Sequence, residues 1–221
     1  MLGFIDLEIT IDSTANLMSL GEKIKKKIDF IFFSSFNVLN WIMKVLNFTS
    51  KNKNGLEVLS NFYKGKLKIN NNWYSCGENA FHGEKYLYIS LFQNYDRKEE
   101  LEKYGKKFQI EGEYGHLNPS EIKKKGGKNG MMLDCSELEL WYKGSMNVQR
   151  QICEEKLKND EKVKNELIKS GNNILVHPSR VNDDKIRKLV WNGRGKKVDG
   201  KIEIIGGNKL GEIWMELRSK L

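Results

Sequence analysis

The chain has 221 residues, a formal net charge of +9, 39% hydrophobic residues and only two prolines. A chain of this length can bury a sizeable core, and this composition excludes an intrinsically disordered protein. Three widely spaced cysteines without a CxxC pair and three scattered histidines without an HExxH motif predict neither a disulfide framework nor a metal site, which favours a cytoplasmic protein without a cofactor.

Residues 1–50 are predicted to be an N-terminal extension whose role the sequence does not indicate. They lack the basic segment, apolar run and cleavage site of a secretory signal. Residues 28–48 are the most apolar stretch, but an aspartate, a lysine and two asparagines interrupt it. A membrane-spanning helix needs about 20 mainly apolar residues. We therefore expect a buried or amphipathic helix here, with a helix on the membrane surface as the alternative.

The main domain is expected to span residues 55–221, after a linker that ends in the sequence KNKNG. Its first two segments, residues 56–63 and 66–74, alternate like short extended strands around a turn at Gly65.

A helix over residues 76–92 would place polar side chains where its apolar anchors belong. Glu78, Phe81, His82 and Lys85 fall at the i, i+3, i+4 and i+7 spacing of a buried stripe. Glu78 and Lys85 would lie two turns apart, about 10 Å along the helix axis. This spacing suits a pocket for a sugar or the end of a nucleotide, and an acid and an amine in such a pocket perturb each other's pKa.

The same residues also have purely structural interpretations. Ser75-x-x-Glu78 matches a capping box, in which Glu78 would only bind the backbone amide of Ser75. Lys85 would then be an exposed lysine paired with Glu84, and His82 a polar neighbour without a chemical role.

The middle of the chain is rich in charged residues. Residues 96–107 are predicted to form a charged helix or loop, and residues 112–130 a long surface loop with a basic run. Residues 145–170 give the clearest helical pattern, with Ser145 as its N-cap and Gly171 just past its end.

The C-terminal part alternates short elements. ILVHPSR at residues 174–180 predicts a short buried strand, Asn182 a cap for the helix DKIRKLVW, and residues 201–205 a strand. The apolar face of residues 209–221 predicts a last helix. Because helices outnumber short, unevenly connected strands, the predicted fold class is α+β, compact and mostly helical.

Two glycine-containing stretches are candidates for ligand contact. Gly206-Gly207-Asn208 leads into the last helix, whose free N-terminal amides would attract phosphate, and Lys209 would add a charge. The string GGNKLG is not GxGxxG, which disfavours a dinucleotide-binding fold; the alternative is an ordinary turn before a helix. Trp191, in the loop WNGRG, would stack on a base or belong to the core.

Several blocks, in the right order, resemble the YbiA-like, or NADAR, family over roughly residues 55–221. The matching blocks are LSNF at 59–62, Trp73-x-Ser75-x-x-Glu78-x-x-Phe81-x-x-x-Lys85-Tyr86, Trp141 and Met146, ILVHPSR, Trp191-x-Gly193-x-Gly195, and Gly207-Asn208-x-Leu210-Gly211-x-x-x-Met215-Glu216-x-Arg218.

The sequence departs from the family pattern at three places. Asn79-Ala80 replaces a His-Tyr pair and His82-Gly83 replaces Gln-Ala, so that Gly83 is expected to make room for a ligand. The family's acidic residue before the WGxG loop corresponds to Asp183 or Asp184, which lie further from Trp191 than the pattern expects.

The resemblance implies a compact α+β fold and an N-glycosidase. Its substrate would be a phosphoribosylamine of the riboflavin pathway or an ADP-ribosylated base. Glu78 would hold the ribose hydroxyls or activate water, and Lys85 would contact phosphate or attack the opened sugar. The resemblance thus implies four candidate catalytic residues, Glu78, Lys85, Asp183 and Asp184. The candidate substrate-binding residues are Asn61, Phe62, Trp73, Phe81, His82, Trp141, Trp191, Gly207, Asn208 and Lys209.

Two other functions fit the sequence. One is an ADP-ribose or nucleotide-binding module without turnover. The other is a nucleic-acid-binding protein that uses the basic runs at residues 23–27, 123–125 and 194–197. An ADP-ribosylated nucleic acid as substrate would reconcile this last function with the glycosidase. None of these interpretations requires a membrane span.

Overall fold

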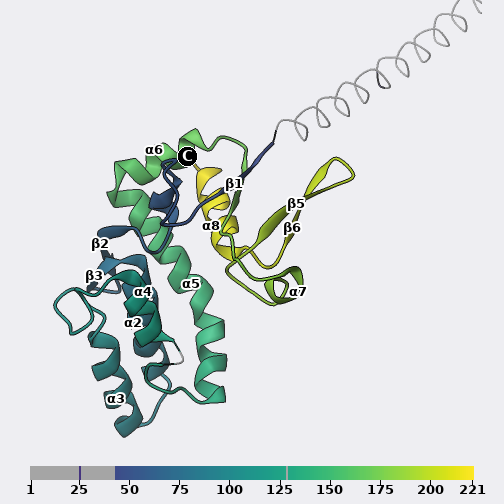
Figure 1. The fold of residues 1–221 in the computed structure, drawn as a ribbon. Coiled ribbons are helices and arrows are strands. Elements are labelled where there is room, and N and C mark those ends of the chain that lie inside the picture. The colour runs from purple at the N-terminus through teal and green to yellow at the C-terminus, as the bar shows by residue number, and fades with distance from the viewer. Residues whose placement is uncertain (1–24, 26–42, 128) are drawn as a thin grey trace, which may run out of the picture. The chain divides into compact units, whose positions relative to one another are not determined.

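A computed structural model of the chain describes residue 25, residues 43–127 and residues 129–221 (Figure 1). The chain divides into two units, residues 1–43 with 197–202, and residues 44–196 with 203–221. The second unit holds both apolar clusters and the candidate site described below, whereas residues 197–202 of the β5–β6 hairpin (residues 194–205) belong to the first. No helix in the described part of the chain is long and apolar enough to cross a membrane.

The described elements are helices, five of them consecutive (α2 to α6), and short strands. The helices are η1 (Leu56–Leu59, a 3-10 helix), α2 (Gly77–Ser90), α3 (Tyr95–Lys106), α4 (Pro119–Gly126), α5 (Cys135–Asn159), α6 (Glu161–Lys169), α7 (Asp183–Ile186) and α8 (Lys209–Arg218). The strands are β1 (Val45–Asn47), β2 (Lys64–Ile69), β3 (Asn72–Cys76), β4 (Ile174–Val176), β5 (Arg194–Val198) and β6 (Lys201–Ile205). The strands form three two-stranded sheets, so the α+β prediction is confirmed.

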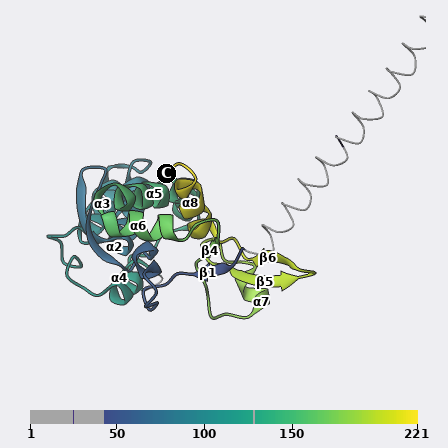
Figure 2. The same cartoon turned by 90° about the horizontal axis from the view of Figure 1, so that it is seen from above.

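β1 replaces the end of the helix expected over residues 28–48, most of which lies outside the described residues. It pairs in parallel with β4, with Leu46 opposite Leu175 (Figure 2). The backbone hydrogen-bonding groups of β1 are thus paired with a strand that is far away in the sequence. Local sequence patterns cannot reveal such pairing. The packed unit therefore includes residues from Lys44 onward, upstream of the expected start at residue 55, and the limits 1–50 and 55–221 stay predictions.

The β2–β3 hairpin has other bounds and another turn than the two extended segments predicted at residues 56–63 and 66–74. Asn70 and Asn71, both with positive φ (47° and 68°), make the turn, and Gly65 lies inside β2. The left-handed conformation that asparagine tolerates is what a two-residue hairpin turn requires. Residues 56–59, expected to be extended, form η1 and bury its apolar side chains.

α2 begins directly after β3 without the expected capping box. Cys76 is the N-cap and provides no side-chain bond. Ser75 is still in β3, where its hydroxyl donates to the Gly115 carbonyl at 2.8 Å. The Glu78 amide instead donates to the Asn61 carbonyl at 3.0 Å, so a neighbouring turn completes the helix end.

The middle of the chain is more helical than expected. Residues 95–106 form α3, which confirms the helical alternative there. α4 lies where we expected only a surface loop, and Asn118 and Glu121 form its capping box with Pro119 at the first turn. These start signals outweigh the basic run that follows, because Ile122 is anchored in the core.

α5 begins well before Ser145, at a capping box between Asp134 and Glu137. Asp160 ends α5 and caps α6 with its carboxylate, so the single helix expected over residues 145–170 is two helices. Gly171 follows α6 with φ +51°, as predicted for a residue past a helix end. The predicted β4, β6 and α8 are confirmed, and Asn182 caps α7 as expected, although α7 ends at Ile186.

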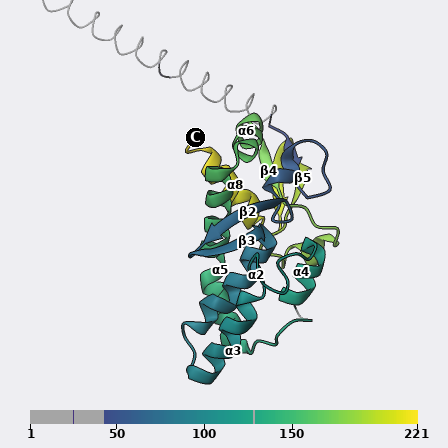
Figure 3. The same cartoon turned by 90° about the vertical axis from the view of Figure 1, so that its left-hand side faces the viewer.

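Two apolar clusters form the core of this unit. The first packs α2, α3, α4 and part of α5 under the β2–β3 hairpin, which lies against α5 and α2 (Figure 3). The second packs η1, α6, β4 and α8 around Trp214, which is fully buried. α5 contributes to both, through Ile152 to the first and Cys153 to the second.

Candidate active site

A cavity of about 680 Å³ lies between residues that belong to the two clusters. Phe81 packs on the first cluster, whereas Trp191 and Leu210 belong to the second. The lining comes from separate segments: the turns at residues 49–52 and 60–62, helices α2, α4 and α5, and residues 177–180, 191–192 and 210.

Glu78 and His82 form a carboxylate–imidazole pair on the α2 wall of the cavity. Glu78 is only 8% exposed, and its Oε1 lies 3.2 Å from Nε2 of His82. Because a carboxylate can only accept, Nε2 carries the proton of this bond. The other ring nitrogen, Nδ1, is buried and has no hydrogen-bond partner among the residues that the structure describes. The second carboxylate oxygen of Glu78, Oε2, accepts no hydrogen bond from the described residues.

Aromatic rings form the neighbouring wall. Phe81 meets the rings of Trp191 at 5.5 Å and Trp141 at 5.0 Å, both edge to face. Trp191 lines the cavity, whereas Trp141 is buried behind Phe81. Such contacts hold Phe81 in one orientation beside the carboxylate.

Hydrogen bonds from α5 fix the turn at residues 60–62. The side-chain amides of Asn61 and Gln149 exchange two hydrogen bonds, at 2.8 and 3.0 Å. Lys156 donates to the Ser60 carbonyl at 2.7 Å, and burial lowers the pKa of this lysine to about 8. These bonds hold Asn61 and Phe62 in the cavity wall.

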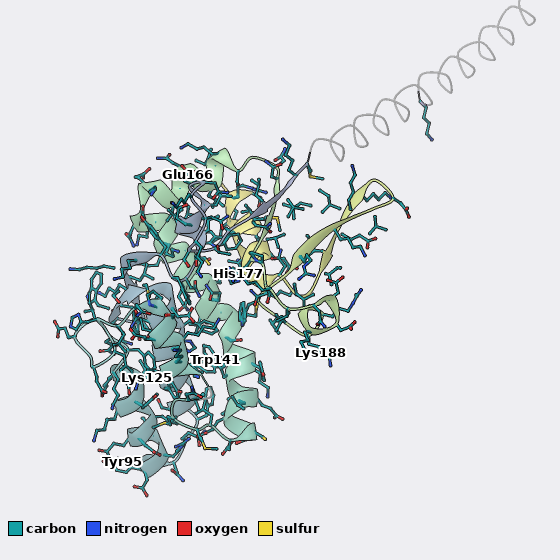
Figure 4. All side chains as sticks on the ribbon, in the orientation of Figure 1. Tyr95, Lys125, Trp141, Glu166, His177 and Lys188 are labelled. Carbon is teal, nitrogen blue, oxygen red and sulfur yellow. The ribbon has the colours of Figure 1, made fainter. Side chains whose placement is uncertain are left out.

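His177 contributes a second imidazole, at the end of β4 (Figure 4). Its Nδ1 lies 3.1 Å from the amide nitrogen of Asn192, and Phe48 stacks on its ring at 5.4 Å. Burial lowers the pKa of His177, and the charge of Lys123 lowers it further against the opposite effect of Glu78.

Positive charge dominates the rest of the lining. Lys51, Lys123 and Arg180 all contribute, and Glu78 is the only acid among the lining residues. None of these three cations forms an ion pair with a carboxylate of the described chain. A cavity with this excess attracts an anionic ligand. No cluster of metal-ligating side chains occurs in the described ranges.

Comparison with known proteins identifies the architecture. No protein-family model matches the sequence, and no curated protein is similar to it. A solution NMR structure of the Escherichia coli protein YbiA superposes with a TM-score of 0.50 and 18% identity, over 80% of this chain and 84% of that one. The chain has a YbiA-like fold. At this identity the likeness concerns the fold alone.

Within the YbiA-like fold, six of the predicted site residues meet in the cavity lining. They are Asn61, Phe62, Glu78, Phe81, His82 and Trp191. Trp73 does not join them: it is 49% exposed on β3, with the Lys68 amine 5.8 Å from its ring.

Lys85 does not line the cavity either. It is buried, its amine donates to the Gly126 carbonyl at the end of α4, and it lies 4.4 Å from the ring of Tyr86. Burial lowers the pKa of Lys85 to about 8. Its position in the YbiA-like fold is that of a tether between α2 and α4. Glu84, its expected partner, accepts from Tyr74, Asn70 and Asn72 instead.

Three of the amides expected to hold phosphate at the start of α8 already have partners within the protein. The amides of Gly207, Asn208 and Lys209 donate to carbonyls of residues 189–192. The buried side chain of Asn208 bridges the His177 amide and the Leu175 carbonyl, and Lys209 pairs with Glu212 at 2.6 Å.

The two acids before the WNGRG loop also lie outside the cavity lining. Asp183 pairs with Arg194, and Asp184 is exposed on α7. Gly83 was expected to make room for a ligand, but the space beside it is filled by side chains of the protein. A Cβ there would lie 2.7 Å from the ring of Tyr74 and 3.2 Å from Phe108.

Sequence reasoning missed several lining residues of the YbiA-like fold. His177 was visible within the ILVHPSR block, but no pattern gave it a role. Lys123 was taken as part of a solvated loop because α4 was not expected. Thr49 and Ser50 fall in the predicted N-terminal extension and Lys51 and Asn52 in the predicted linker, and no spacing pattern indicates Gln149 or Asn192.

Proposed function

We propose that this protein is an N-glycosidase that hydrolyses the bond between a ribosyl group and a nitrogen atom in a phosphorylated substrate. The substrate classes are a phosphoribosylamine and an ADP-ribosylated base. One observation carries the proposal: the buried carboxylate of Glu78 opens into a cavity whose other charged residues are cations.

Glu78 has the chemistry that this reaction requires. The C1–N bond breaks with its electron pair going to the departing nitrogen, which takes up a proton from solvent. A carboxylate beside C1 stabilises the oxocarbenium-like sugar and accepts a proton from the water that adds to C1. His82, bonded to Oε1 of Glu78, orients the carboxylate and leaves Oε2 for the substrate or the water.

The cationic lining supports a phosphorylated substrate. Lys51, Lys123 and Arg180 provide donors that match phosphate oxygens. They take the place of the amides before α8, which the protein's own carbonyls occupy. Trp191 and Phe81 supply flat faces and edges for a sugar or base ring.

The test is product release from both substrate classes. Purified protein is incubated separately with a phosphoribosylamine and with ADP-ribosyl-guanosine, and the freed base or amine is quantified over time by mass spectrometry. We expect time-dependent release from one of them, and none after heat denaturation. If neither substrate is cleaved at any pH between 5 and 9, the proposal is wrong.

A nucleotide-binding module is the second candidate, because the lining holds a single acid. Many glycosidases use two carboxylates, one as acid and one as base or nucleophile. Saturable binding of ADP-ribose without any product from either substrate would favour this module over the enzyme.

A further inference from the structure

His177 lines the cavity but has no part in the hydrolysis described above. Its backbone is fixed on both sides: its amide donates to Oδ1 of Asn208 at 3.0 Å, and its carbonyl accepts from the Gly193 amide at 2.9 Å. The ring itself is held by stacking on Phe48 and by the contact of its Nδ1 with Asn192.

Asn192 decides which ring nitrogen of His177 carries the proton. Nδ2 of Asn192 lies 3.1 Å from Nδ1 of His177, and also 3.2 Å from the Pro178 carbonyl and 3.4 Å from the His177 carbonyl. Carbonyls only accept, so the atom of Asn192 that faces them is the NH₂ group. Nδ1 of His177 therefore accepts, and the proton of the neutral ring is on Nε2.

The Nε2–H group is free to donate into the cavity. No hydrogen bond of ordinary geometry joins it to a described residue, although the Trp191 carbonyl interacts with the ring and partly offsets the lowering of the His177 pKa by burial. The nitrogen is not among the buried unpartnered atoms found in the described part of the chain, so solvent reaches it. Phe48 covers one face of the ring. Burial and the nearby charge of Lys123 lower the pKa of His177, which keeps the ring neutral at pH 7.

The surrounding groups are donors as well. Lys123 lies on α4 with its amine 6.0 Å from the ring of Phe62, and Arg180 follows His177 by three residues in the same wall. Ammonium and guanidinium groups have no acceptor to offer. Water reaches these exposed cations, and a ligand rich in acceptors, such as an oxyanion, can replace it by accepting from all three donors.

We propose that His177, Lys123 and Arg180 form an anion subsite that takes a phosphate group of the substrate, with Nε2–H of His177 donating to a phosphate oxygen. The subsite rests on the proposed function only for the identity of the phosphorylated ligand. It places the phosphate end of the substrate at the β4 and α4 side of the cavity and the sugar toward Glu78.

The first experiment determines which ring nitrogen of His177 carries the proton in the protein without ligand. Long-range ¹H–¹⁵N NMR correlations of the histidine rings at pH 7 distinguish the Nε2–H and Nδ1–H tautomers. We expect His177 as the Nε2–H form, and addition of ribose 5-phosphate to shift its Nε2 resonance while ribose does not. An Nδ1–H tautomer, or equal shifts with ribose, would overturn the subsite.

The second experiment uses variants and calorimetric binding of ribose 5-phosphate. His177→Leu should weaken binding about tenfold, because a donor to a charged acceptor is lost, whereas His177→Gln, which keeps an N–H there, should stay within about threefold. Lys123→Met should weaken binding about fivefold, and Lys124→Met, its exposed neighbour on α4, should not. Equal effects of the two lysine variants, or of the two histidine variants, would contradict the proposal.

These measurements separate the subsite from the glycosidase. Binding of ribose 5-phosphate that depends on His177 and Lys123, without base release from either test substrate, supports the subsite and removes the enzyme. Base release that is unaffected by His177→Leu in both kcat and KM removes the subsite and leaves the enzyme.

Discussion

The two halves of α2 each bury an acid and a base, but only the first half faces the cavity. In the second half, Glu84 accepts three hydrogen bonds and Lys85 donates to a backbone carbonyl. In the first half, Glu78 has one bond, from His82, and an oxygen left open. A buried charge that the protein satisfies fully is structural, whereas one left partly open is available for a ligand.

The largest effect expected from this difference between Glu78 and Glu84 follows from neutralising Glu78. Glu78→Gln should reduce the rate of base release about 1000-fold, because the carboxylate that stabilises the sugar cation and takes a proton is lost. Its free energy of unfolding should change by less than about 1 kcal/mol, since one bond to His82 remains possible. Steady-state rates and urea unfolding measure both. Full activity in a folded Glu78→Gln protein would remove Glu78 from the mechanism.

Neutralising Glu84 should have the opposite outcome. Glu84→Leu leaves the buried Tyr74 hydroxyl and two asparagine amides without their acceptor, which should lower the free energy of unfolding by about 3 kcal/mol. The activity of the folded fraction should be unchanged. Glu99→Leu, on the exposed face of α3, is the control and should stay within about 0.5 kcal/mol. A large loss of activity at unchanged stability would contradict the structural role.

The two buried lysines predict how stability depends on pH. Burial lowers the pKa values of Lys85 and Lys156 to about 8 from 10.5. Between these values the unfolded chain binds more protons than the folded chain, so stability rises with pH. We expect a contribution of about 2 kcal/mol from each lysine between pH 7 and 9.5. Lys156→Met should remove about half of this rise in urea-unfolding experiments.

The pH range of that experiment has an upper limit. Burial, with the adjacent Glu84, raises the pKa of Tyr74, so above pH 10 the unfolded chain loses tyrosine protons first and stability falls. An identical slope in Lys156→Met and the parent below pH 9.5 would show that this amine is not held in a lowered-pKa state.

The smallest effect concerns Gly83, between the two halves of α2. Gly83→Ala gains about 1 kcal/mol of helix propensity but pushes a methyl group into Tyr74, which should cost about 2 kcal/mol, for a net loss of about 1 kcal/mol. Gly65→Ala is the control, because a Cβ there meets nothing within 4 Å. A thermal melt shows the difference; a stabilised Gly83→Ala would mean that the contact relaxes.

Helix-capping signals in the sequence predicted the fold best where no tertiary contact competes with them. Asn182 and Gly171 marked helix ends correctly, because caps depend on neighbouring residues. The capping box predicted at Ser75 does not form, because the Ser75 hydroxyl donates to the Gly115 carbonyl and the Glu78 amide donates to the Asn61 carbonyl. β1 was taken for helix because its partner, β4, is far along the chain.

Helical spacing predicted only the α2 part of the candidate site. The stripe on α2 correctly brought Glu78, Phe81 and His82 to one place, but it also suggested Lys85, which turns toward α4. His177 and Lys123 reach the cavity only through tertiary contacts, and no period in the sequence connects them with α2.

The paired amides of Asn61 and Gln149 have one more consequence. If both groups rotate by half a turn together, donor and acceptor exchange places and the two bonds reform unchanged. The thiol of Cys153, 3.5 Å behind Gln149, tolerates either state because sulfur donates or accepts weakly. Donor and acceptor in this part of the cavity wall can therefore exchange places at little cost in free energy.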